Sequence, residues 1–428
     1  MEIKIAYGKG SKNINISGEK IIDVLNPYNG EVIKNRYISE EVELALEEPT
    51  GMLPLINLVN KNSKIVIIVD DNTRPTPTKK ILDPILKTIK KKNISNKNIT
   101  IIVAVGMHKK LNREELIGIL GKEIYDNYNI ENHDALNKKT LIDLGETSFG
   151  TPVLINKKVY KADLRILTGL IKPHNIAGYT GGGKSILPGV CGLDTILSNH
   201  SFKATSHPHS CLGVIEGNPM REDIEEVLKL IGTSFMINVL LNYKEEVVKV
   251  VAGDVIKAHR KGVEFQDKLS KLDVAKQAEI CICGTPAPID INFYQMLNSI
   301  SAPYRIKKPI IKSDGTIIVV GSSKEGISDG DFYDVLKNVP RELVWERIKS
   351  KKIIYKERPA LHIYLEGERE YNLIVVSEER NRQLFRDMNM KFFSNLQIAV
   401  DNVINKYQNK ENVIVLPYAP YIIPHLVE

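Results

Sequence analysis

The chain has 428 residues, of which 43% are hydrophobic and 26% are charged, so it can bury full apolar cores and is long enough for two or three domains. The formal charge is +7, and much of the excess lies in short lysine runs without interleaved aromatic residues, which argues against nucleic-acid binding. No apolar stretch reaches the 18 residues of a transmembrane helix, so no membrane association is expected.

The first predicted element is a strand at residues 1–8, which alternate apolar and polar residues and lack the apolar stretch of a signal peptide. We therefore expect a cytoplasmic protein. Further strands are predicted at 65–69, 99–105 and 164–171, with helices at 77–91 and 113–120. Continuous apolar runs are typical of parallel strands that are buried on both faces. Their alternation with helices indicates an α/β fold with a mainly parallel sheet flanked by helices.

The same alternation resumes after a charged helix at 254–271, which we expect to connect two domains. Strands are predicted at 278–283, 316–320, 373–376 and 413–416, and helices at 290–300, 340–349 and 392–407. The sequence therefore predicts two α/β domains, 1–270 and 271–428. In the second of these, Cys281 and Cys283 are two residues apart in one strand, so both thiols should lie on one buried face as small apolar groups.

Polar residues follow three of the predicted strands in the first domain. Asp71 and Arg74 follow the first strand, His108 follows the second and His174 follows the third. The carboxyl ends of parallel strands meet at one edge of a sheet, where α/β proteins bind their ligands. We therefore expect a site at this edge, although Asp71 could instead cap the helix that follows it.

A glycine-rich segment, Gly178–Ser185, matches the G-x-x-x-x-G-K-[ST] pattern of a phosphate-binding P-loop. A nucleotide triphosphatase is therefore one alternative. The context argues against it, because residues 172–177 separate the loop from its strand, and Gly189 and Gly192 weaken the helix that should follow. The glycines still predict a close approach of the backbone to a bulky ligand, which Lys184 would face as a cation or a nucleophile.

Read together, these residues resemble the nickel-pincer-dependent lactate racemase family. The ordered set that carries the resemblance comprises Asp71-Asn72-Thr73-Arg74-Pro75, Gly106-Met107-His108, Lys172-Pro173-His174, the loop from Gly178 to Lys184, His200 and Gln295. The set spans most of the N-terminal two thirds of the chain and enters the second domain. A shared set of this length is far more specific than the P-loop pattern inside it.

The resemblance implies an isomerase that inverts carbon 2 of a 2-hydroxy acid. Its cofactor would be nickel in a pyridinium-3,5-bisthiocarboxylic acid mononucleotide, which is made by separate cofactor-biosynthesis enzymes. By resemblance, Lys184 is the covalent attachment point and His200 the nickel ligand, Asp71, Asn72, Thr73 and Arg74 contact the cofactor, His108 and His174 are the acid/base pair, and Arg74, Gln295 and Asn298 meet the substrate. The domain at 1–270 would bind the cofactor, and the domain at 271–428 would close over the substrate, with the site in the cleft between them.

The chemistry needs these residue types. The cofactor would take the hydrogen of carbon 2 as hydride, leaving a planar 2-keto acid that is reduced again on its other face. Each face then needs a group that exchanges the hydroxyl proton, and histidine titrates near neutrality. Arginine binds a carboxylate through two parallel hydrogen bonds, and imidazole is a suitable nickel ligand.

The sequence departs from the family pattern in the second domain. Asn298 stands where the lactate-binding members have a lysine, and 356–360 replaces their aspartate-glutamine-tryptophan segment, the only tryptophan being Trp345. The substrate could therefore be a larger or more polar acid than lactate. A binding protein of the same fold without catalysis is a third alternative.

The remaining histidines carry weaker signals. His207 and His209 flank a proline and could bind a metal, but no third ligand is evident. The other four, His133, His259, His362 and His425, have no supporting context and are predicted to be structural.

Overall fold

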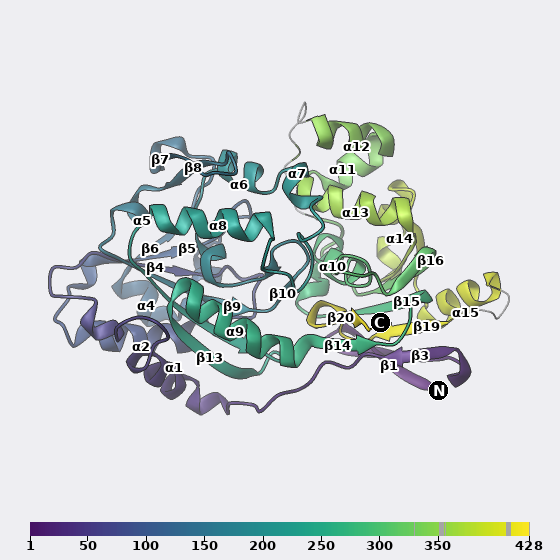
Figure 1. Cartoon of the computed structure of the whole chain (residues 1–428), viewed down its shortest axis with the longest axis horizontal. Helices are drawn as coiled ribbons and strands as arrows, with labels where there is room; N and C mark the ends of the chain where they lie inside the picture. The colour runs from purple at the N-terminus through teal and green to yellow at the C-terminus, as the bar shows by residue number, and fades with distance from the viewer. Residues whose placement is uncertain (329, 351–354, 356, 408–411, 428) are drawn as a thin grey trace.

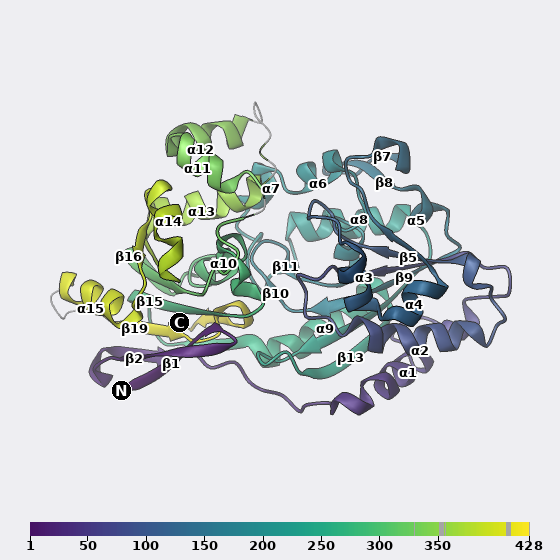
Figure 2. The same cartoon turned by 180° about the vertical axis from the view of Figure 1, so that it is seen from behind.

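Two α/β units lie next to each other in the computed structural model (Figure 1), which describes residues 1–328, 330–350, 355, 357–407 and 412–427. The same two units are seen from behind in Figure 2. None of the helices in these ranges is long and apolar enough to cross a membrane. The expected fold class, two mainly parallel sheets flanked by helices, is confirmed.

The first sheet has six strands in the order β13-β12-β9-β4-β5-β6. Their bounds are β4 (Ile65–Val69), β5 (Ile99–Val103), β6 (Asn129–Asn132), β9 (Leu164–Ile171), β12 (Ser234–Leu241) and β13 (Val247–Asp254). All neighbours pair in parallel except β12 and β13. The three predicted strands are confirmed, and β5 ends two residues before its predicted end at residue 105.

Both faces of this sheet are covered by helices, as the continuous apolar strands predicted. The covering helices are α1 (Ile38–Glu47), α2 (Thr78–Lys90) and α3 (Arg113–Leu120) on one face, and α8 (Pro219–Leu230) and α9 (Val255–Ser270) on the other. Alternate residues of β4 divide between the faces, since Ile67 packs with α1 and α2 while Ile68 packs with α8 and α9. Because both faces are buried, the strands are held in place, and the residues at their ends can form a site.

The second sheet is built around β15 (Ala278–Pro286), which pairs in parallel with β16 (Ile311–Val320) and β19 (Val413–Leu416). β17 (Asn372–Val376) and β18 (Lys391–Phe393) continue the sheet beyond β16. It is covered by α10 (Phe293–Ile300), α11 (Phe332–Asn338), α13 (Arg358–Glu370) and α15 (Leu396–Lys406), while α12 (Arg341–Ser350) packs on α13. Cys281 and Cys283 are fully buried on the face toward α10, so their predicted apolar role is confirmed.

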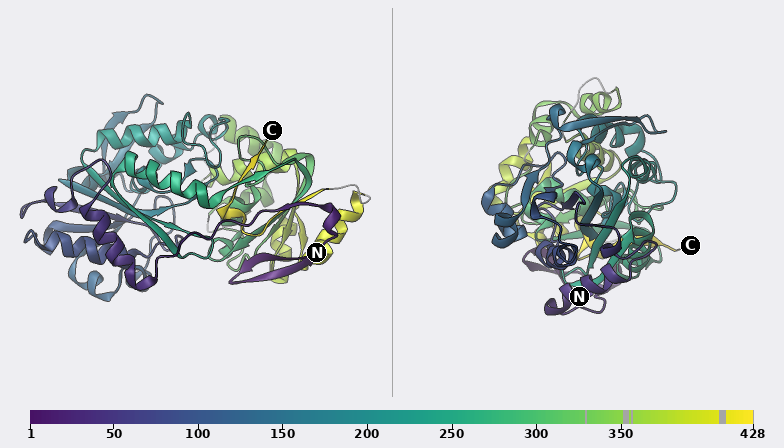
Figure 3. Two further views of the ribbon diagram at one scale, coloured as in Figure 1. Left: turned by 60° about the horizontal axis from the view of Figure 1, so that its bottom comes forward. Right: turned by 90° about the vertical axis from the view of Figure 1, so that its left-hand side faces the viewer.

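The N-terminal strands belong to this second sheet. β1 (Glu2–Gly8) pairs with the end of β15, β2 (Gly10–Asn15) forms a hairpin with β1, and β3 (Ile21–Val24) pairs with β19. In Figure 3 the purple N-terminal strands lie beside the yellow C-terminal helix, across the molecule from α2. The strand at residues 1–8 is thus confirmed, but its partners come from the opposite end of the chain.

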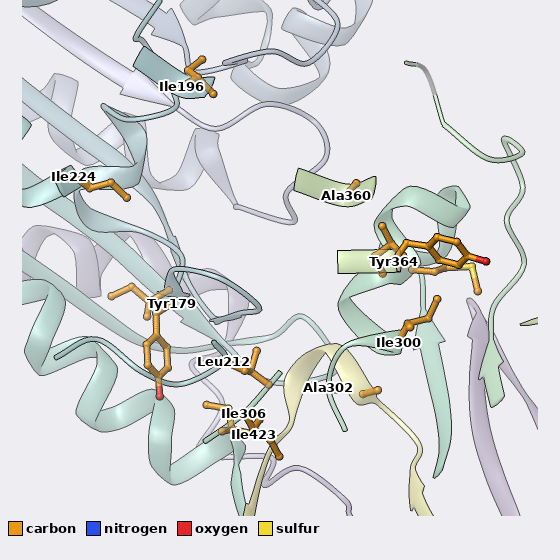
Figure 4. Close-up of a cluster of buried hydrophobic side chains, with 14 of the residues drawn as sticks. Tyr179, Ile196, Leu212, Ile224, Ile300, Ala302, Ile306, Ala360, Tyr364 and Ile423 are labelled. Atoms are coloured by element: carbon orange, nitrogen blue, oxygen red, sulfur yellow. The ribbon is translucent and has the colours of Figure 1, made fainter. Parts of the chain in front are cut away.

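The two units share one continuous apolar core. Leu212 of the first unit, Ile306 of the second and Ile423 near the C-terminus lie together in Figure 4 and belong to one buried cluster. A parallel pair, β14 (Lys271–Val274) with β20 (Ile423–Leu426), follows directly on α9. The connecting helix α9 is therefore followed directly by a strand of this packed region and not by a flexible linker.

Candidate active site

The ends of β4 and β5 bring an aspartate and a histidine together. Asp71 is buried, and its Oδ2 lies 2.7 Å from Nδ1 of His108. The backbone N–H of Thr73 donates to Oδ1 of Asp71 at 3.0 Å. The following helix, α2, has Pro77 as its N-cap residue. Asp71 therefore does not cap that helix; its Oδ2 contacts His108 instead.

Electrostatics keep this aspartate ionised. Burial alone would raise its pKa, but the hydrogen bond from His108 and the positive charge of Arg74 lower the pKa of Asp71 to about 2. A carboxylate accepts hydrogen bonds only, so Nδ1 of His108 must carry the proton in this pair. The lone pair of the neutral ring then lies on Nε2, the nitrogen that can receive a proton from a ligand.

The second histidine has different surroundings. His174 lies in β10 (Pro173–His174), which pairs with β11 (Gly178–Tyr179) across a tight turn. Its Nδ1 accepts from the backbone N–H groups of Ile176 and Ala177 at 3.3 and 3.2 Å. Burial, together with the charges of Lys184 and Arg74, lowers its pKa well below the usual range. The resting ring is therefore neutral, and its proton lies on Nε2.

The glycine loop runs from β11 into a 3-10 helix at Gly182–Ser185. At Gly178, where φ is +73°, a Cβ atom would lie 2.1 Å from the carbonyl oxygen of Val214, so only glycine fits. The next α-helix does not begin until Leu193. A P-loop needs a helix directly after its lysine, so the triphosphatase alternative is not favoured.

Lys184 extends from this loop into a buried, positively charged environment. Burial, together with the charges of Arg221 and Arg74, lowers the pKa of its amine well below the usual range. The lowered pKa favours the uncharged form of the amine, which can act as a nucleophile. A neutral amine is the form that an acyl or thioacyl group can attach to.

His200 directly follows α6 (Leu193–Asn199) as its C-cap residue. Its Nδ1 donates to the carbonyl oxygen of Ile196 at 3.1 Å, which leaves the Nε2 lone pair free. Burial and the charge of Lys184 lower its pKa to about 3, so the imidazole stays neutral. A neutral ring that is oriented through its other nitrogen is the usual arrangement of a metal-binding histidine.

The described residues contain no group of three or more histidine, cysteine, aspartate or glutamate side chains that could hold a metal ion. A metal bound by His200 would therefore need most of its donors from a non-protein group. Such a group fits beside Lys184, to which it could be attached. His207 and His209, the other candidate metal site, are both exposed.

The remaining predicted residues of the first domain differ in where they lie. Arg74 influences the pKa of His174 and Lys184, so its charge is felt across the whole group. Thr73 holds Asp71 through both its N–H and its hydroxyl. Asn72 is exposed, and its Nδ2 donates to Glu115 at 3.3 Å. The structure thus gathers Arg74 and Thr73 around the histidines but turns Asn72 toward α3.

The predicted residues of the second domain lie on α10. Gln295 and Asn298 are both partly buried, and Nδ2 of Asn298 donates to the carbonyl oxygen of Gln295 at 2.8 Å. Burial raises the pKa of the adjacent Tyr294 to about 12, while Arg74 acts in the opposite direction. The charge of Arg74 is thus felt at α10, which links the two sets of predicted residues. Lys356, in the segment that departs from the family, lies outside the described residues.

Several supporting residues carry no signal in the sequence. Arg221 is 1% exposed, and its Nη2 donates to the carbonyl oxygens of Ala177 and Tyr179 on either side of Gly178. Asn238 accepts from the N–H of Gly182 at 2.8 Å. Both residues fix the glycine loop, yet they belong to an ordinary helix and strand, and only the tertiary structure brings them to the site.

The isolated histidines behave as structural residues, as predicted. His133 lies 2.8 Å from the carbonyl oxygen of Cys191, and Nε2 of His259 lies 2.8 Å from that of Thr180. His362 is buried, and His425 pairs with Asp273 at the surface.

The second unit also contributes a buried arginine to this region. Nε of Arg305 donates at 3.2 Å to the carbonyl oxygen of Asn175, the residue after His174. Its Nη2 donates to the carbonyl oxygens of Thr205 and Ser210 at 2.6 and 2.9 Å. The backbone around His174 is therefore held from both units.

Comparisons with known proteins agree with this arrangement. Residues 7–213 match the lactate racemase N-terminal domain, and residues 274–423 match the lactate racemase C-terminal domain. The lactate racemase of Thermoanaerobacterium thermosaccharolyticum is 30% identical over 97% of each chain. That of Lactiplantibacillus plantarum is 30% identical over 88% of this chain and 89% of its own.

Solved structures extend the comparison to the fold. The lactate racemase apoprotein from Thermoanaerobacterium thermosaccharolyticum has a TM-score of 0.90 at 28% identity, covering 99% of this chain and 100% of its own. A protein from Thermotoga maritima shares the fold at 16% identity, with a TM-score of 0.70 over 93% of this chain and 100% of its own. The chain, matched along almost its whole length by relatives of one kind, belongs to the lactate racemase family and is an isomerase of the racemase type.

Proposed function

We propose that this racemase inverts carbon 2 of a 2-hydroxy acid, either lactate or a related acid, with a nickel-pincer mononucleotide attached to Lys184. The observation that carries the proposal is the combination of a partly buried Lys184 amine, whose pKa is lowered well below its usual range, with a His200 whose Nδ1 is bound to the carbonyl oxygen of Ile196 and whose Nε2 is free. One residue can hold a cofactor covalently, and the other can ligate its metal. The relatives named lactate racemase, one of them solved as an apoprotein, support a cofactor and a hydroxy-acid substrate.

The proposed cofactor site lies within residues 1–270. Lys184 would form the covalent link and His200 the nickel bond, while Asp71, Thr73 and Arg74 would line the site. When bound, the cofactor would supply an electron-poor centre that takes up and returns the hydrogen of carbon 2 as hydride. The contact proposed for Asn72 would require its side chain to leave Glu115.

The two histidines would move the hydroxyl proton, one on each face of the substrate. His108 is prepared as a base, because Asp71 holds its Nδ1 proton and stabilises the imidazolium that forms. His174 rests with its proton on Nε2 and is prepared to donate. In the reverse reaction His174 would act as the base and His108 as the acid. The two histidines would therefore serve both directions, although they start with their protons on different nitrogens.

The substrate would lie in the cleft between the domain at 1–270 and the domain at 271–428, which would close over it. Arg74 would bind the carboxylate through its planar guanidinium. Gln295 and Asn298 would bind the other polar groups of the acid. Asn298 brings no charge where the lactate-binding members have a lysine. We therefore propose an acid with a polar substituent that hydrogen-bonds to the Asn298 amide. Cofactor-biosynthesis enzymes would be partners, and the cytoplasm the expected location.

The test is production of the protein together with the enzymes that make the cofactor. Intact mass should show a sulfur-containing adduct, with one nickel per chain, and Lys184→Arg should lack the adduct while folding normally. The loaded enzyme should exchange the 2-hydrogen of at least one acid in a panel of 2-hydroxy acids. Unmodified wild-type protein, or loaded protein that exchanges no acid, would overturn the proposal.

A further inference from the structure

A buried arginine of the second unit reaches the backbone of His200. Arg358, at the start of α13, is only 4% exposed. Its Nη2 donates to the carbonyl oxygen of His200 at 3.1 Å and also to that of Leu197. Both carbonyls lie at the C-terminal end of α6, the short helix that presents His200. The contact therefore joins the two units at the proposed nickel ligand.

The end of a helix needs such a contact. The last carbonyl groups of an α-helix have no partner within the helix, and a cation there interacts favourably with the helix dipole. α6 has only seven residues, and helices this short depend on tertiary contacts for their stability. One guanidinium nitrogen that holds both carbonyls fixes the backbone from which the His200 ring extends.

The same face of α13 also contacts the residues that follow His200 in the chain. His362, one turn after Arg358, contacts the hydroxyl of Thr205 at 2.7 Å and packs against Phe202, with ring centroids 4.7 Å apart and ring planes inclined by 36°. α13 and α7 (Phe202–Thr205) lie side by side in Figures 1 and 2. The segment 197–205 is therefore held along its length by one helix of the second unit.

A structural role alone does not favour arginine at this position. Taking a guanidinium out of water is costly, and Nε of Arg358 has no hydrogen-bond partner among the described residues. An apolar side chain could fill the same volume without that cost. What the arginine supplies is a long, charged side chain whose Nη2 donates to the carbonyls of both Leu197 and His200.

We infer that Arg358 is a positioning residue, which fixes the His200 imidazole toward the metal and makes its orientation depend on the docking of the second unit. The inference rests on the proposed function, because it takes His200 as the nickel ligand. Residues that orient a metal ligand typically change metal affinity about tenfold to a hundredfold when they are replaced.

The test uses cofactor-loaded holoenzyme and the variant Arg358→Gln, with Arg358→Lys as a conservative replacement. Arg341→Gln is the matched control, since Arg341 also donates to helix-end carbonyls, those of Leu336 and Met388, but within the second unit. The measurements are the mass of the Lys184 adduct, nickel release to a chelator and the visible spectrum. We expect unchanged adduct mass, nickel release about tenfold to a hundredfold faster in Arg358→Gln, and a spectrum shifted in the direction given by His200→Ala.

Arg358→Lys should show a smaller change of the same kind, because lysine keeps the positive charge and its donors but has a differently shaped head group. Arg341→Gln should release nickel at the wild-type rate. Should Arg358→Gln fail to fold, the inference is judged on Arg358→Lys, which keeps the charge. Wild-type release and an unchanged spectrum in a folded Arg358 variant would overturn the inference and leave the proposed function standing. Wild-type protein without adduct or nickel would overturn the proposed function itself.

Discussion

At the scale of single residues, the site is organised by the partners of its histidines. His108 faces an ionised carboxylate through Nδ1, His174 faces two backbone N–H groups through the same atom, and His200 donates from it to a carbonyl oxygen. In the proposed mechanism, one residue type thus serves as a base, as a proton donor and as a metal ligand. The surroundings of Nδ1, rather than the imidazole itself, set the role of each ring.

The pairing with Asp71 should be essential for His108. In Asp71→Asn the amide can donate to Nδ1, which would place the ring proton on Nε2 and remove the base. We expect racemisation of the accepted acid to fall by about a hundredfold to ten-thousandfold in kcat, with KM little changed. Thr73→Val, which removes only the hydroxyl contact to Asp71, should have a far smaller effect. Comparable losses in both variants would contradict this assignment.

Two neighbouring aspartates should affect stability with opposite signs. Burial raises the pKa of Asp70 to about 6, so the ionised form of this residue destabilises the folded state. The destabilisation is complete above pH 6 and is absent below about pH 4. Asp71, with its pKa lowered to about 2, stabilises the fold above pH 4 and loses this effect as the pH falls through 2. We expect Asp70→Asn to raise the free energy of unfolding at pH 7.5 by about 2 to 3 kcal/mol.

Urea unfolding of wild type, Asp70→Asn and Asp71→Asn at several pH values measures this contrast. The gain in Asp70→Asn should shrink as the pH is lowered from 6 to 4. Asp71→Asn should be destabilised over the same range, because it loses the ionised partner of His108. A gain that does not depend on pH would show that the charge of Asp70 is not its cause.

At the scale of elements, the glycine loop matters because it must pass very close to other backbone. Arg221, Asn238 and His259 hold the loop against α8, β12 and α9, which places Lys184 at its end. The glycines predicted a close approach to a bulky ligand, whereas the structure shows at Gly178 a close approach to the backbone of Val214. The segment also resembled a phosphate loop, because the local sequence pattern is the same. No α-helix begins directly after Ser185, and in the sequence only the surrounding glycines and proline indicate this.

Gly178→Ala should be much more damaging than another glycine replacement of equal backbone strain. Gly178 and Gly150 have nearly the same φ, +73° and +74°, but a Cβ atom at Gly150 meets nothing within 4 Å. Gly150→Ala should therefore cost only about 1 kcal/mol of conformational strain. Gly178→Ala should cost several times as much or prevent folding, because the displaced atoms are backbone. Denaturant titration of both variants tests this, and equal losses would contradict it.

At the scale of the whole molecule, the chain closes on itself. The N-terminal strands complete the second sheet, since β1 pairs with the end of β15 and β3 pairs with β19. Ile3, Ile5 and Ile14 pack in one cluster with α15. The domain at 271–428 proposed from the sequence therefore lacks a part of its own sheet, which residues 2–24 supply.

Much of this architecture could be predicted from local patterns. Apolar runs gave β4, β9 and β15 within a few residues, and the strand ends indicated where Asp71, His108 and His174 would gather. Partners distant in sequence could not be predicted. Nothing in residues 1–8 specifies pairing with β15, and nothing in α13 marks Arg358 as a partner of His200, because such contacts depend on how whole elements pack.

Fragments should reveal the missing strands. A fragment of residues 271–428 should unfold without cooperativity, since the apolar edge of β15 and β19 is left exposed. The same fragment followed by a flexible linker and residues 1–24 should show a cooperative thermal transition by circular dichroism. The control replaces Ile3 and Ile5 with Asp in the linked segment, which should abolish the transition. Cooperative unfolding of residues 271–428 alone would contradict the expectation.

The pairing of β1 and β3 with strands near the C-terminus also affects how the protein is made. β1 and β3 are translated well before β15 and β19, with which they pair, and at about 5 to 20 residues per second the interval is tens of seconds. The first sheet can assemble meanwhile, but the N-terminal hairpin has an open edge during that time. We therefore expect residues 2–24 to benefit from a chaperone during biosynthesis.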